Sequence, residues 1–387
     1  MTSKSQSIVD IKTTIFNHPL VKEVDNTDEL RLLCYPSTVD SEKLNSDTIL
    51  QASRGVVVIK KTGKILLPSF HHTSEFTLGD PNLENILSDN VLNTSSIFPS
   101  LEGTLIRVFY HNKWYISTHR KLDAFKSKWG CKRSYGEFFE DAVNKLGNTL
   151  DEFKESLNKD KQYLFLMRND MENRIVSICE DENKLYHVGT YVNGKLEMNT
   201  ETVTIVPPVA PLQLKTREDI VEFVIKHCDP KELQGVVIFT NENAVKVISG
   251  AYNYLKSLRG NEQSVKFRYL QLRTNLEKNN DLRNLYREWE PVFDEYENTI
   301  FEVCQKIYKA YVKRYILKEH VVVPKEEFYI MKLCHAWHME DRNLNKIRLD
   351  KVIEVFNENL KPPCVNRIIK RILHKKRTEE SDDMQVE

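Results

Sequence analysis

The segment that contains Ser100, Glu102 and Gly103 has the most distinctive combination of reactive side chains in the sequence. A hydroxyl, a carboxylate and a glycine stand directly before residues 104–110, whose alternating pattern predicts a strand that returns after a turn at residues 111–113. A serine hydroxyl becomes a nucleophile only when a neighbouring base removes its proton. No such base is evident beside Ser100, so its hydroxyl lacks the group that would activate it.

A second candidate is the basic segment, residues 113–133. It has seven lysines and arginines but one acid, Asp123, and four aromatic residues alternate with the cations. Such a segment can hold phosphates and stack bases. The alternative is a solvated strand-and-loop face over an aromatic core, and the sequence leaves both open. The expected nucleic-acid contacts are Lys121, Lys126, Lys128, Lys132 and Arg133.

The composition is that of a globular protein with two domains. The chain has 387 residues, 40% of them hydrophobic and 29% charged, and a domain usually takes about 100–200 residues. Lys+Arg and Asp+Glu both number 56, so net charge gives no global signal for nucleic acid. No apolar run approaches the roughly 18 residues of a membrane span, and the N-terminus lacks the apolar core of a signal peptide.

The cysteines and the short motifs give no sign of a disulfide framework, a zinc site or a common catalytic motif. Seven scattered cysteines without a C-x-x-C pair indicate reduced thiols in an intracellular compartment. His335 and His338 lie one helical turn apart beside Cys334, but without a fourth ligand we expect packing rather than a zinc site. There is no glycine-rich phosphate loop and no H-E-x-x-H motif. Lys375–Arg377 is only a weak nuclear signal.

Strand patterns alternate with helix patterns in the first two thirds of the chain, and helix patterns fill the rest. Strand pairs are predicted over residues 56–67, 162–178, 185–196 and 235–248, and amphipathic helices over 134–157 and 216–228. From about residue 262 apolar residues recur every three or four positions. We therefore expect an α+β fold with one domain over 1–260, an all-helical domain over 261–377 and an acidic, disordered tail over 378–387.

Several of these segments resemble, in order, the motifs of the bacteriophage-type RNA ligases. These enzymes are covalent nucleotidyltransferases that also occur in large DNA viruses. Ser100–Gly103 resembles their lysine-x-acid-glycine motif, with serine in place of the nucleophilic lysine. The other similar segments are residues 52–56, 68–76, 117–120, 172–176, 233–237 and 245–252. The resemblance implies an ATP-grasp-like ligase domain of antiparallel sheets with flanking helices, followed by a helical domain.

The resemblance also implies which roles are lost. In that family a lysine attacks the α-phosphate of ATP, and carboxylates hold the metal ions that neutralise the phosphates. Here Ser100 takes the position of the nucleophile, Met167 and Gln234 take two metal-binding positions, and Ile248 replaces the second lysine of the last motif. ATP and Mg²⁺ are expected only if the ancestral site is retained. The nucleotide contacts that the resemblance then implies are Arg54, Glu102, Arg120 and Lys246.

The sequence therefore predicts a pseudo-ligase that binds nucleotide or nucleic acid without ligating. One alternative is an active ATP-dependent RNA ligase or nucleotidyltransferase with a displaced lysine, such as Lys113 or Lys121. The other is a structural or assembly protein that uses the fold as a scaffold. The expected partners are RNA or another nucleic acid, and a protein bound by the helical domain, but no membrane. A virus-encoded cytoplasmic protein fits these expectations.

Overall fold

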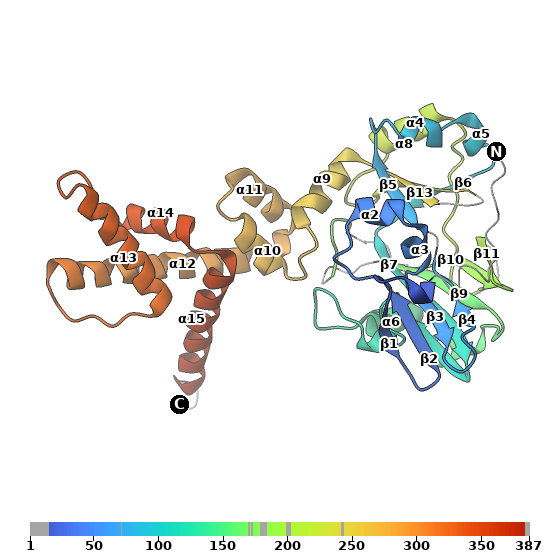
Figure 1. Cartoon of the computed structure of the whole chain (residues 1–387), viewed down its shortest axis with the longest axis horizontal. Coiled ribbons are helices and arrows are strands. Elements are labelled where there is room, and N and C mark those ends of the chain that lie inside the picture. Colours follow the sequence, from blue (N-terminus) through green and yellow to red (C-terminus); the bar gives the residue numbers. More distant parts are fainter. Residues whose placement is uncertain are drawn as a thin grey trace. The chain divides into compact units, whose positions relative to one another are not determined.

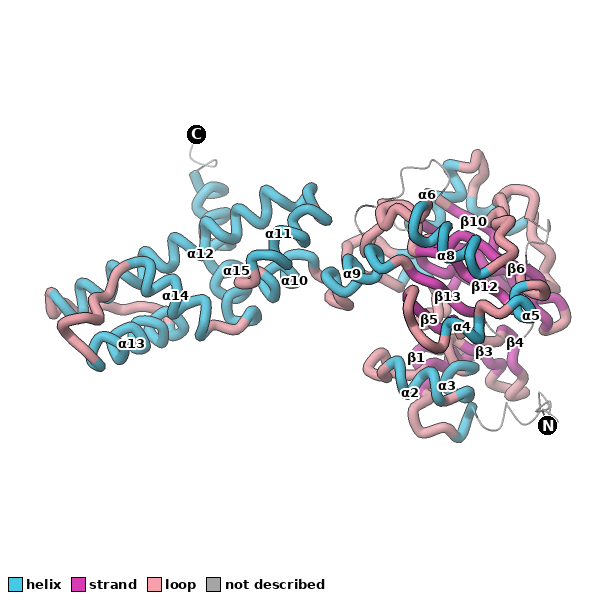
Figure 2. Tube along the Cα trace, turned by 90° about the horizontal axis from the view of Figure 1, so that it is seen from above, coloured by secondary structure: helices cyan, strands magenta, loops and turns pink. Residues whose placement is uncertain are grey.

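The computed structural model describes residues 15–70, 72–168, 171, 173–178, 184–198, 203–240 and 244–383. The chain divides into two compact units, Met1–Ser257 and Leu258–Glu387. All strands that the structure describes belong to the first unit, whereas the described part of the second unit is helical (Figures 1 and 2). The expected α+β class, with antiparallel sheets and a helical C-terminal region, is confirmed.

The largest sheet has five antiparallel strands in the order β11–β10–β9–β7–β8. The strands are β7 (Gly103–His111), β8 (Lys113–Ser117), β9 (Gln162–Arg168), β10 (Leu185–Val192) and β11 (Lys195–Met198). The predicted turns between β7 and β8 and between β10 and β11 are confirmed. Asn112, Asn193 and Gly194 have φ angles of 59°, 52° and 80°. Asparagine and glycine tolerate this left-handed backbone best, so both turns follow from local sequence.

Apolar side chains cover both faces of this sheet. On one face, α6 (Tyr135–Lys145) and α7 (Leu150–Glu155) close a core in which Phe139, Phe153 and Phe165 contact one another edge to face. The other face shares a core with a four-stranded antiparallel sheet. The strands of that sheet are β1 (Lys22–Asn26), β2 (Leu30–Cys34), β3 (Val56–Ile59) and β4 (Ile65–Leu67). The largest sheet is therefore the central layer of the unit.

The sequence predicts one helix over residues 134–157, but the structure has two. Ser134 caps α6 through a reciprocal pair of hydrogen bonds with Glu137. Gly147 then adopts a φ of 83°, which ends the first helix, and Thr149 caps α7. The periodic apolar residues continue across this break, so periodicity alone did not reveal it.

The third sheet has the order β5–β13–β12–β6, in which β5 runs parallel to β13 and the other pairs are antiparallel. Its strands are β5 (Thr73–Thr77), β6 (Ser96–Ser100), β12 (Gly235–Phe239) and β13 (Ala244–Ile248). The remaining helices of this unit are α2 (Ser41–Ser46), α3 (Thr48–Ala52), α4 (Leu83–Ile86), α5 (Asp89–Leu92), α8 (Arg217–Lys226) and the single 3₁₀ turn Ala124–Lys126. The helices α4, α5 and α8 share a core with this sheet.

The second unit is built around one long helix, α12 (Glu290–Tyr311), which has Pro291 in its first turn and continues into the π-helical turn Val312–Ile316. The other helices are α9 (Gly250–Arg259), which begins in the first unit, α10 (Val265–Leu272), α11 (Leu276–Leu285), the 3₁₀ turn Arg287–Trp289, α13 (Lys325–Glu340), α14 (Leu349–Asn359) and α15 (Pro362–Asp383). Composition predicted disorder from residue 378, whereas α15 is helical to Asp383. No described helix has the length and apolar character needed to cross a membrane.

Candidate functional site

Ser100, Glu102 and Gly103 lie where two sheets meet. Ser100 ends β6 and pairs with Gly235 of β12, whereas Gly103 begins β7 in the five-stranded sheet. The two residues between them therefore carry the chain from one sheet to the other. A Cβ on Gly103 would lie 2.5 Å from the Met167 carbonyl oxygen, so the close approach of β9 requires glycine here.

The Glu102 carboxylate is buried and occupied by hydrogen-bond donors. It accepts the backbone N–H of Ile175 at 2.7 Å and those of Val176 and Ser177 at 2.9 Å each. The hydroxyl of Tyr252 donates to it at 2.9 Å. A carboxylate has about four acceptor sites, so these donors occupy Glu102 and fix the segment of residues 175–177.

This arrangement corrects one prediction of secondary structure. The sequence predicts a second strand within residues 162–178, but the described residues between β9 and residue 178 contain none. The N–H groups of residues 175–177 donate to Glu102 instead of pairing in a sheet. Glu172, at the start of the ligase-like segment 172–176, lies outside the described residues.

Four side chains from separate parts of the chain form a hydrogen-bonded network with Glu102. Ser100 Oγ and Lys246 Nζ both donate to Gln234 Oε1, at 3.0 and 3.1 Å. Gln234 Nε2 donates to the Tyr252 hydroxyl at 3.0 Å, and Tyr252 in turn donates to Glu102. Burial and Glu102 raise the pKa of Tyr252, which therefore stays protonated and donates. We call these five residues the polar network; they come from β6, the residue before β12, β13, α9 and the β6–β7 junction.

The charge of Lys246 is balanced at the edge of the polar network. Burial lowers the pKa of Lys246, and Glu75, whose carboxylate lies 3.9 Å from Lys246 Nζ, opposes that effect. Lys256 also forms an ion pair with Glu75. Burial alone would raise the pKa of Glu75, but the two lysines outweigh burial and lower it. Glu75 is therefore a carboxylate held between two cations.

A second group of cations surrounds His119. Burial lowers the pKa of His119 to about 3, and the charges of Arg54, Arg107 and Arg120 act in the same direction. Arg54 also contributes to the lowered pKa of Lys246. Two predicted nucleotide contacts, Arg54 and Arg120, therefore lie beside the same imidazole, and Arg54 connects this group electrostatically to the polar network.

Sequence reasoning missed Arg107. This residue is buried in β7 and donates to the carbonyl oxygens of Gly55 and Thr118, the second at 2.5 Å. Its Nε has no hydrogen-bond partner among the described residues. The signal that could have revealed it is its place on the same strand face as Leu105 and Phe109, where a charged side chain needs buried partners.

Met167 lies apart from the polar network. It is buried in the apolar core between the five-stranded sheet and α6, in the same cluster as Phe138 and Phe165. A thioether in that core is not placed to contact a phosphate. Gln234, the other position assigned to metal binding, is part of the polar network.

Three of the seven cations of the basic segment form ion pairs with acids. Lys121 lies 3.8 Å from Asp25, Lys126 lies 3.6 Å from Asp123, and Arg133 pairs with Asp141. Lys128 and Lys132 are exposed. The aromatic residues of the segment are partly used in packing, since Tyr115 is buried and stacks on Phe109.

Nothing in the described residues suggests a metal centre. They contain no group of three or more His, Cys, Asp or Glu side chains placed to hold an ion. His335 stacks on Tyr315, with ring centroids 3.8 Å apart, and His338 Nδ1 lies 2.6 Å from the carbonyl oxygen of Asn345. The six cysteines of the described part are free thiols, and Cys179 lies outside it.

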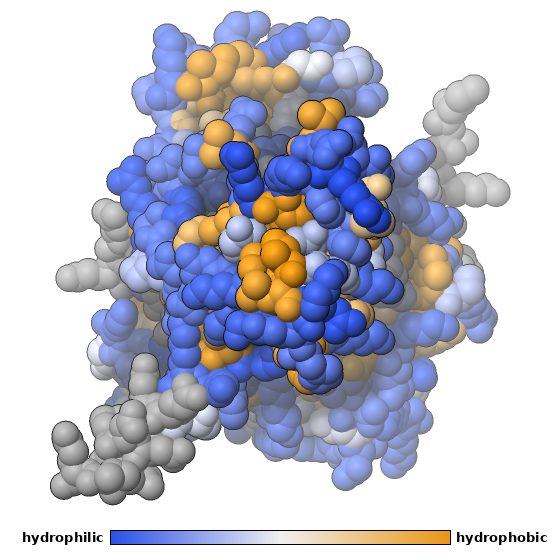
Figure 3. All heavy atoms as spheres, turned by 90° about the vertical axis from the view of Figure 1, so that its left-hand side faces the viewer, coloured by the Kyte–Doolittle hydropathy of each residue, from blue (hydrophilic) through white to orange (hydrophobic). Residues whose placement is uncertain are grey.

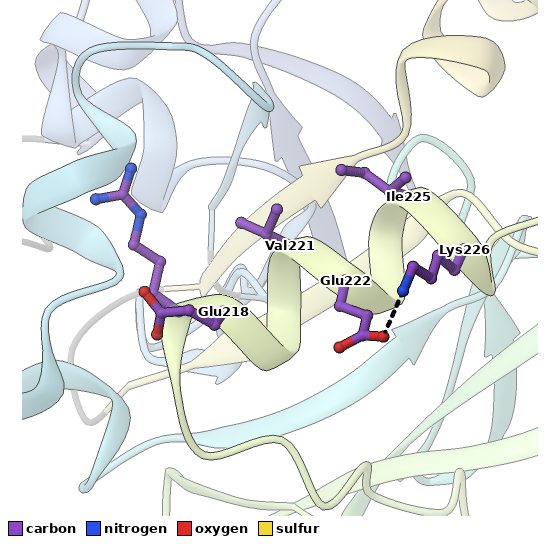
Figure 4. Close-up of a pocket in the computed structure, with 6 residues that line it drawn as sticks. Glu218, Val221, Glu222, Ile225 and Lys226 are labelled. Atoms are coloured by element: carbon purple, nitrogen blue, oxygen red, sulfur yellow. Dashed lines mark hydrogen bonds and ion pairs between the residues drawn. The ribbon is translucent and has the colours of Figure 1, made fainter.

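A surface hollow runs along α8 but has no relation to the polar network (Figure 4). All its lining residues belong to this single helix, and Glu222 and Lys226 in it form an ion pair of 2.8 Å. Ligand sites usually bring polar groups together from several elements. The hollow along α8 does not bring together polar groups from several elements.

No protein-family model matches the chain. Two curated viral proteins do match, and both are named immediate-early protein ICP-46 homolog. The protein of Invertebrate iridescent virus 3 is 30% identical over 359 aligned residues, and the match covers 89% of this chain and 78% of that protein. The chain belongs to this family. The protein of Invertebrate iridescent virus 6 is 31% identical over 355 aligned residues, and the match covers 83% of this chain and 77% of that protein.

Two solved structures of an archaeal ATP-dependent RNA ligase, forms 1 and 2, are also similar to the chain. They show 9% and 10% sequence identity and TM-scores of 0.42 and 0.41. Each comparison covers 72% of this chain and 69% of the ligase. At this level of similarity we draw the chemistry of the site from the residues of the polar network alone.

Proposed function

We propose that this protein is a ligase-type nucleotidyltransferase that has lost lysine adenylylation and binds the phosphates of a nucleotide or nucleic acid. The observation that carries the proposal is the polar network. Ser100, at the nucleophile position, donates a hydrogen bond to the amide oxygen of Gln234. An amide oxygen is not a base at neutral pH and cannot activate the hydroxyl. Lys246 donates to the same oxygen. Both side chains therefore hydrogen-bond within the protein, and neither has a base beside it in the polar network that would activate a nucleophile.

The cations beside the polar network support phosphate binding. The charges of Arg54, Arg107 and Arg120 all lower the pKa of the His119 imidazole. Lys246 lies next to Ser100, with which it shares a hydrogen-bond acceptor. Arginine is suited to phosphate because its planar group donates two parallel hydrogen bonds. Under this proposal Arg54, Arg120 and Lys246 contact the phosphates, whereas the contacts already made by Glu102 give it a structural role.

The residues present do not fit a protein-bound Mg²⁺. Met167 lies in the apolar core, and Gln234 offers a neutral oxygen that already accepts two hydrogen bonds. Mg²⁺ in phosphate sites is usually held by one or two carboxylates together with the phosphates. The proposed binding therefore relies on side-chain cations. The named relatives are immediate-early proteins of iridescent viruses, and we infer that this chain is likewise virus-encoded and acts inside the infected cell.

The test is the intact mass of the protein after incubation with ATP and Mg²⁺ or Mn²⁺. We expect no AMP adduct on the natural protein. An adduct on Ser100→Lys alone would show that the pocket still binds ATP and a metal ion. An adduct on the natural protein would overturn the loss of adenylylation. Phosphate binding is tested separately, by the affinity of each protein for a labelled nucleotide. Arg54→Ala should weaken that affinity about tenfold, whereas the matched change of another exposed cation, Lys61→Ala in the turn between β3 and β4, should not.

One observation favours a second candidate, an active nucleotidyltransferase with a displaced lysine. Of the lysines considered, Lys246 is the one beside the nucleophile position, because its Nζ shares a hydrogen-bond acceptor with Ser100 Oγ. Lys113 is exposed beside the β7–β8 turn, and Lys121 pairs with Asp25. Burial also lowers the pKa of Lys246, which favours a neutral amine. This candidate predicts an AMP adduct on the natural protein that peptide mapping assigns to Lys246 and that Lys246→Arg removes.

A further inference from the structure

One end of the helical unit exposes an unusual concentration of large apolar side chains. Thirteen such side chains are exposed in the described part of the protein, and four of them lie at or just beyond the ends of the π-helical turn and α13. Ile316, Leu317 and Leu344 are 63%, 58% and 79% exposed. Figure 3 views the molecule from this end and shows apolar side chains gathered on a mostly hydrophilic surface. We call Ile316, Leu317, Met339 and Leu344 the apolar tip.

The apolar tip is a single surface because α12 and α13 end beside each other. Tyr315, in the π-helical turn that follows α12, stacks on His335 of α13. Burial lowers the pKa of His335, and the charges of His338, Lys318 and Arg342 add to this effect. Lys318 follows α12 and Arg342 follows α13, so the chain segments beyond both helices approach the same imidazole.

The loop that presents Leu344 is fixed by hydrogen bonds. Asp341 Oδ1 accepts the N–H of Leu344 at 3.0 Å, and the Asp341 carbonyl oxygen accepts the N–H of Asn345 at 2.8 Å. Asn345 Nδ2 donates to the Trp337 carbonyl oxygen at 2.7 Å, and His338 Nδ1 donates to the Asn345 carbonyl oxygen. Leu344 is thus held out to solvent by a pre-organised loop, which reduces the entropy that a partner must remove on binding.

The chain segments that carry the apolar tip have more positive than negative residues. Residues 312–320 and 339–348 together contain six lysines and arginines but three acids, whereas the whole chain is neutral. One of the three acids, Asp341, is engaged by backbone N–H groups of its own loop. The cations are Lys313, Arg314, Lys318, Arg342, Lys346 and Arg348.

We propose that the apolar tip is a docking site for a partner protein that presents an acidic amphipathic helix. The large aliphatic side chains of that helix would cover Ile316, Leu317 and Leu344, and its carboxylates would face the cations of the two segments. Nucleic acid fits less well, because bases stack on aromatic rings and do not bury aliphatic side chains. A second copy of the same tip would bring like charges together. This inference does not depend on the proposed function of the first unit.

The test measures binding of the full-length protein to labelled peptides by fluorescence anisotropy. One peptide is an acidic amphipathic helix of leucine and glutamate, and its control has lysine in place of glutamate. We expect the natural protein to bind the acidic peptide. The paired change Leu317→Ser and Leu344→Ser should weaken this binding at least about tenfold, as should Lys318→Glu with Arg342→Glu. Leu276→Ser is the matched control, because Leu276 is 76% exposed in α11, outside the apolar tip.

Three results would overturn the proposal. The first is that the natural protein does not bind the acidic peptide, or binds both peptides equally. The second is that the paired variants bind as well as Leu276→Ser does. The third is that the natural protein binds phosphatidylserine-containing vesicles or single-stranded RNA through the apolar tip while ignoring the acidic peptide. Because all the changed residues are exposed, circular dichroism should show the same helical content in every variant.

Discussion

The polar network and the basic segment differ in how their polar groups find partners. In the polar network the partners are buried and far apart in the chain, as Glu102 and Tyr252 are, with 150 residues between them. In the basic segment they are exposed and often local, as Lys126 and Asp123 are. A buried group that loses its partner costs about 1–3 kcal/mol, and more if charged, whereas an exposed ion pair is worth about 0–1 kcal/mol. Burial, more than the number of charges, decides which region the fold depends on.

The largest expected effect tests the buried side of this comparison. Glu102→Ala leaves three backbone N–H groups and the Tyr252 hydroxyl without their acceptor, so the free energy of unfolding should fall by about 3 kcal/mol or more. Urea unfolding measures the loss, and hydrogen exchange should speed up at residues 175–177. Glu29→Ala, which removes an exposed carboxylate that accepts from Asn112, should cost less than about 0.5 kcal/mol. Equal losses of stability in the two variants would mean that burial does not decide how much a carboxylate contributes.

An intermediate effect is expected from His119. Its pKa is about 3 in the folded protein and 6.5 in the unfolded chain. Between these pH values the unfolded state binds more protons, so stability falls as the pH falls below 6.5. His119→Gln removes this contribution and should flatten the decline between pH 7 and pH 5 by about 1–2 kcal/mol. Urea unfolding at both pH values measures it, with exposed His320→Gln as the control. An unchanged slope would mean that His119 is not buried among arginines.

The smallest expected effect is on the exposed side. Neutralising Arg120, Lys121, Lys126 and Lys128 together should weaken single-stranded RNA binding at all sequences and flatten its salt dependence. Each phosphate contact contributes about 0.7 to the logarithmic salt slope. Because Lys121 and Lys126 already pair with acids, the slope should fall by about 1–1.5. Filter binding across a salt series measures this. Unchanged affinity and slope would exclude the basic segment as a nucleic-acid site and favour the assembly alternative.

The sequence predicted correctly those turns and helices that depend on residues close together in the chain. The β7–β8 and β10–β11 hairpins follow from the turn residues, and α8 follows from its Thr216 cap and apolar spacing. The break between α6 and α7 was missed because the apolar period continues across Gly147. The strand predicted after β9 was wrong because its amides have a distant acceptor, Glu102. Local pattern cannot reveal an acceptor that lies more than 70 residues away.

The sequence by itself determined the α+β class, the helical C-terminal region and the absence of lysine at Ser100, because these depend on residue types and their spacing. Only the tertiary structure decided that Ser100, Gln234, Lys246, Tyr252 and Glu102 form one hydrogen-bonded network. It also placed Met167 in an apolar core, Arg107 near His119, and the ends of α12 and α13 together. The physical reason is that burial and distant partners set the energy of a polar group, and both arise only when separate segments of the chain meet.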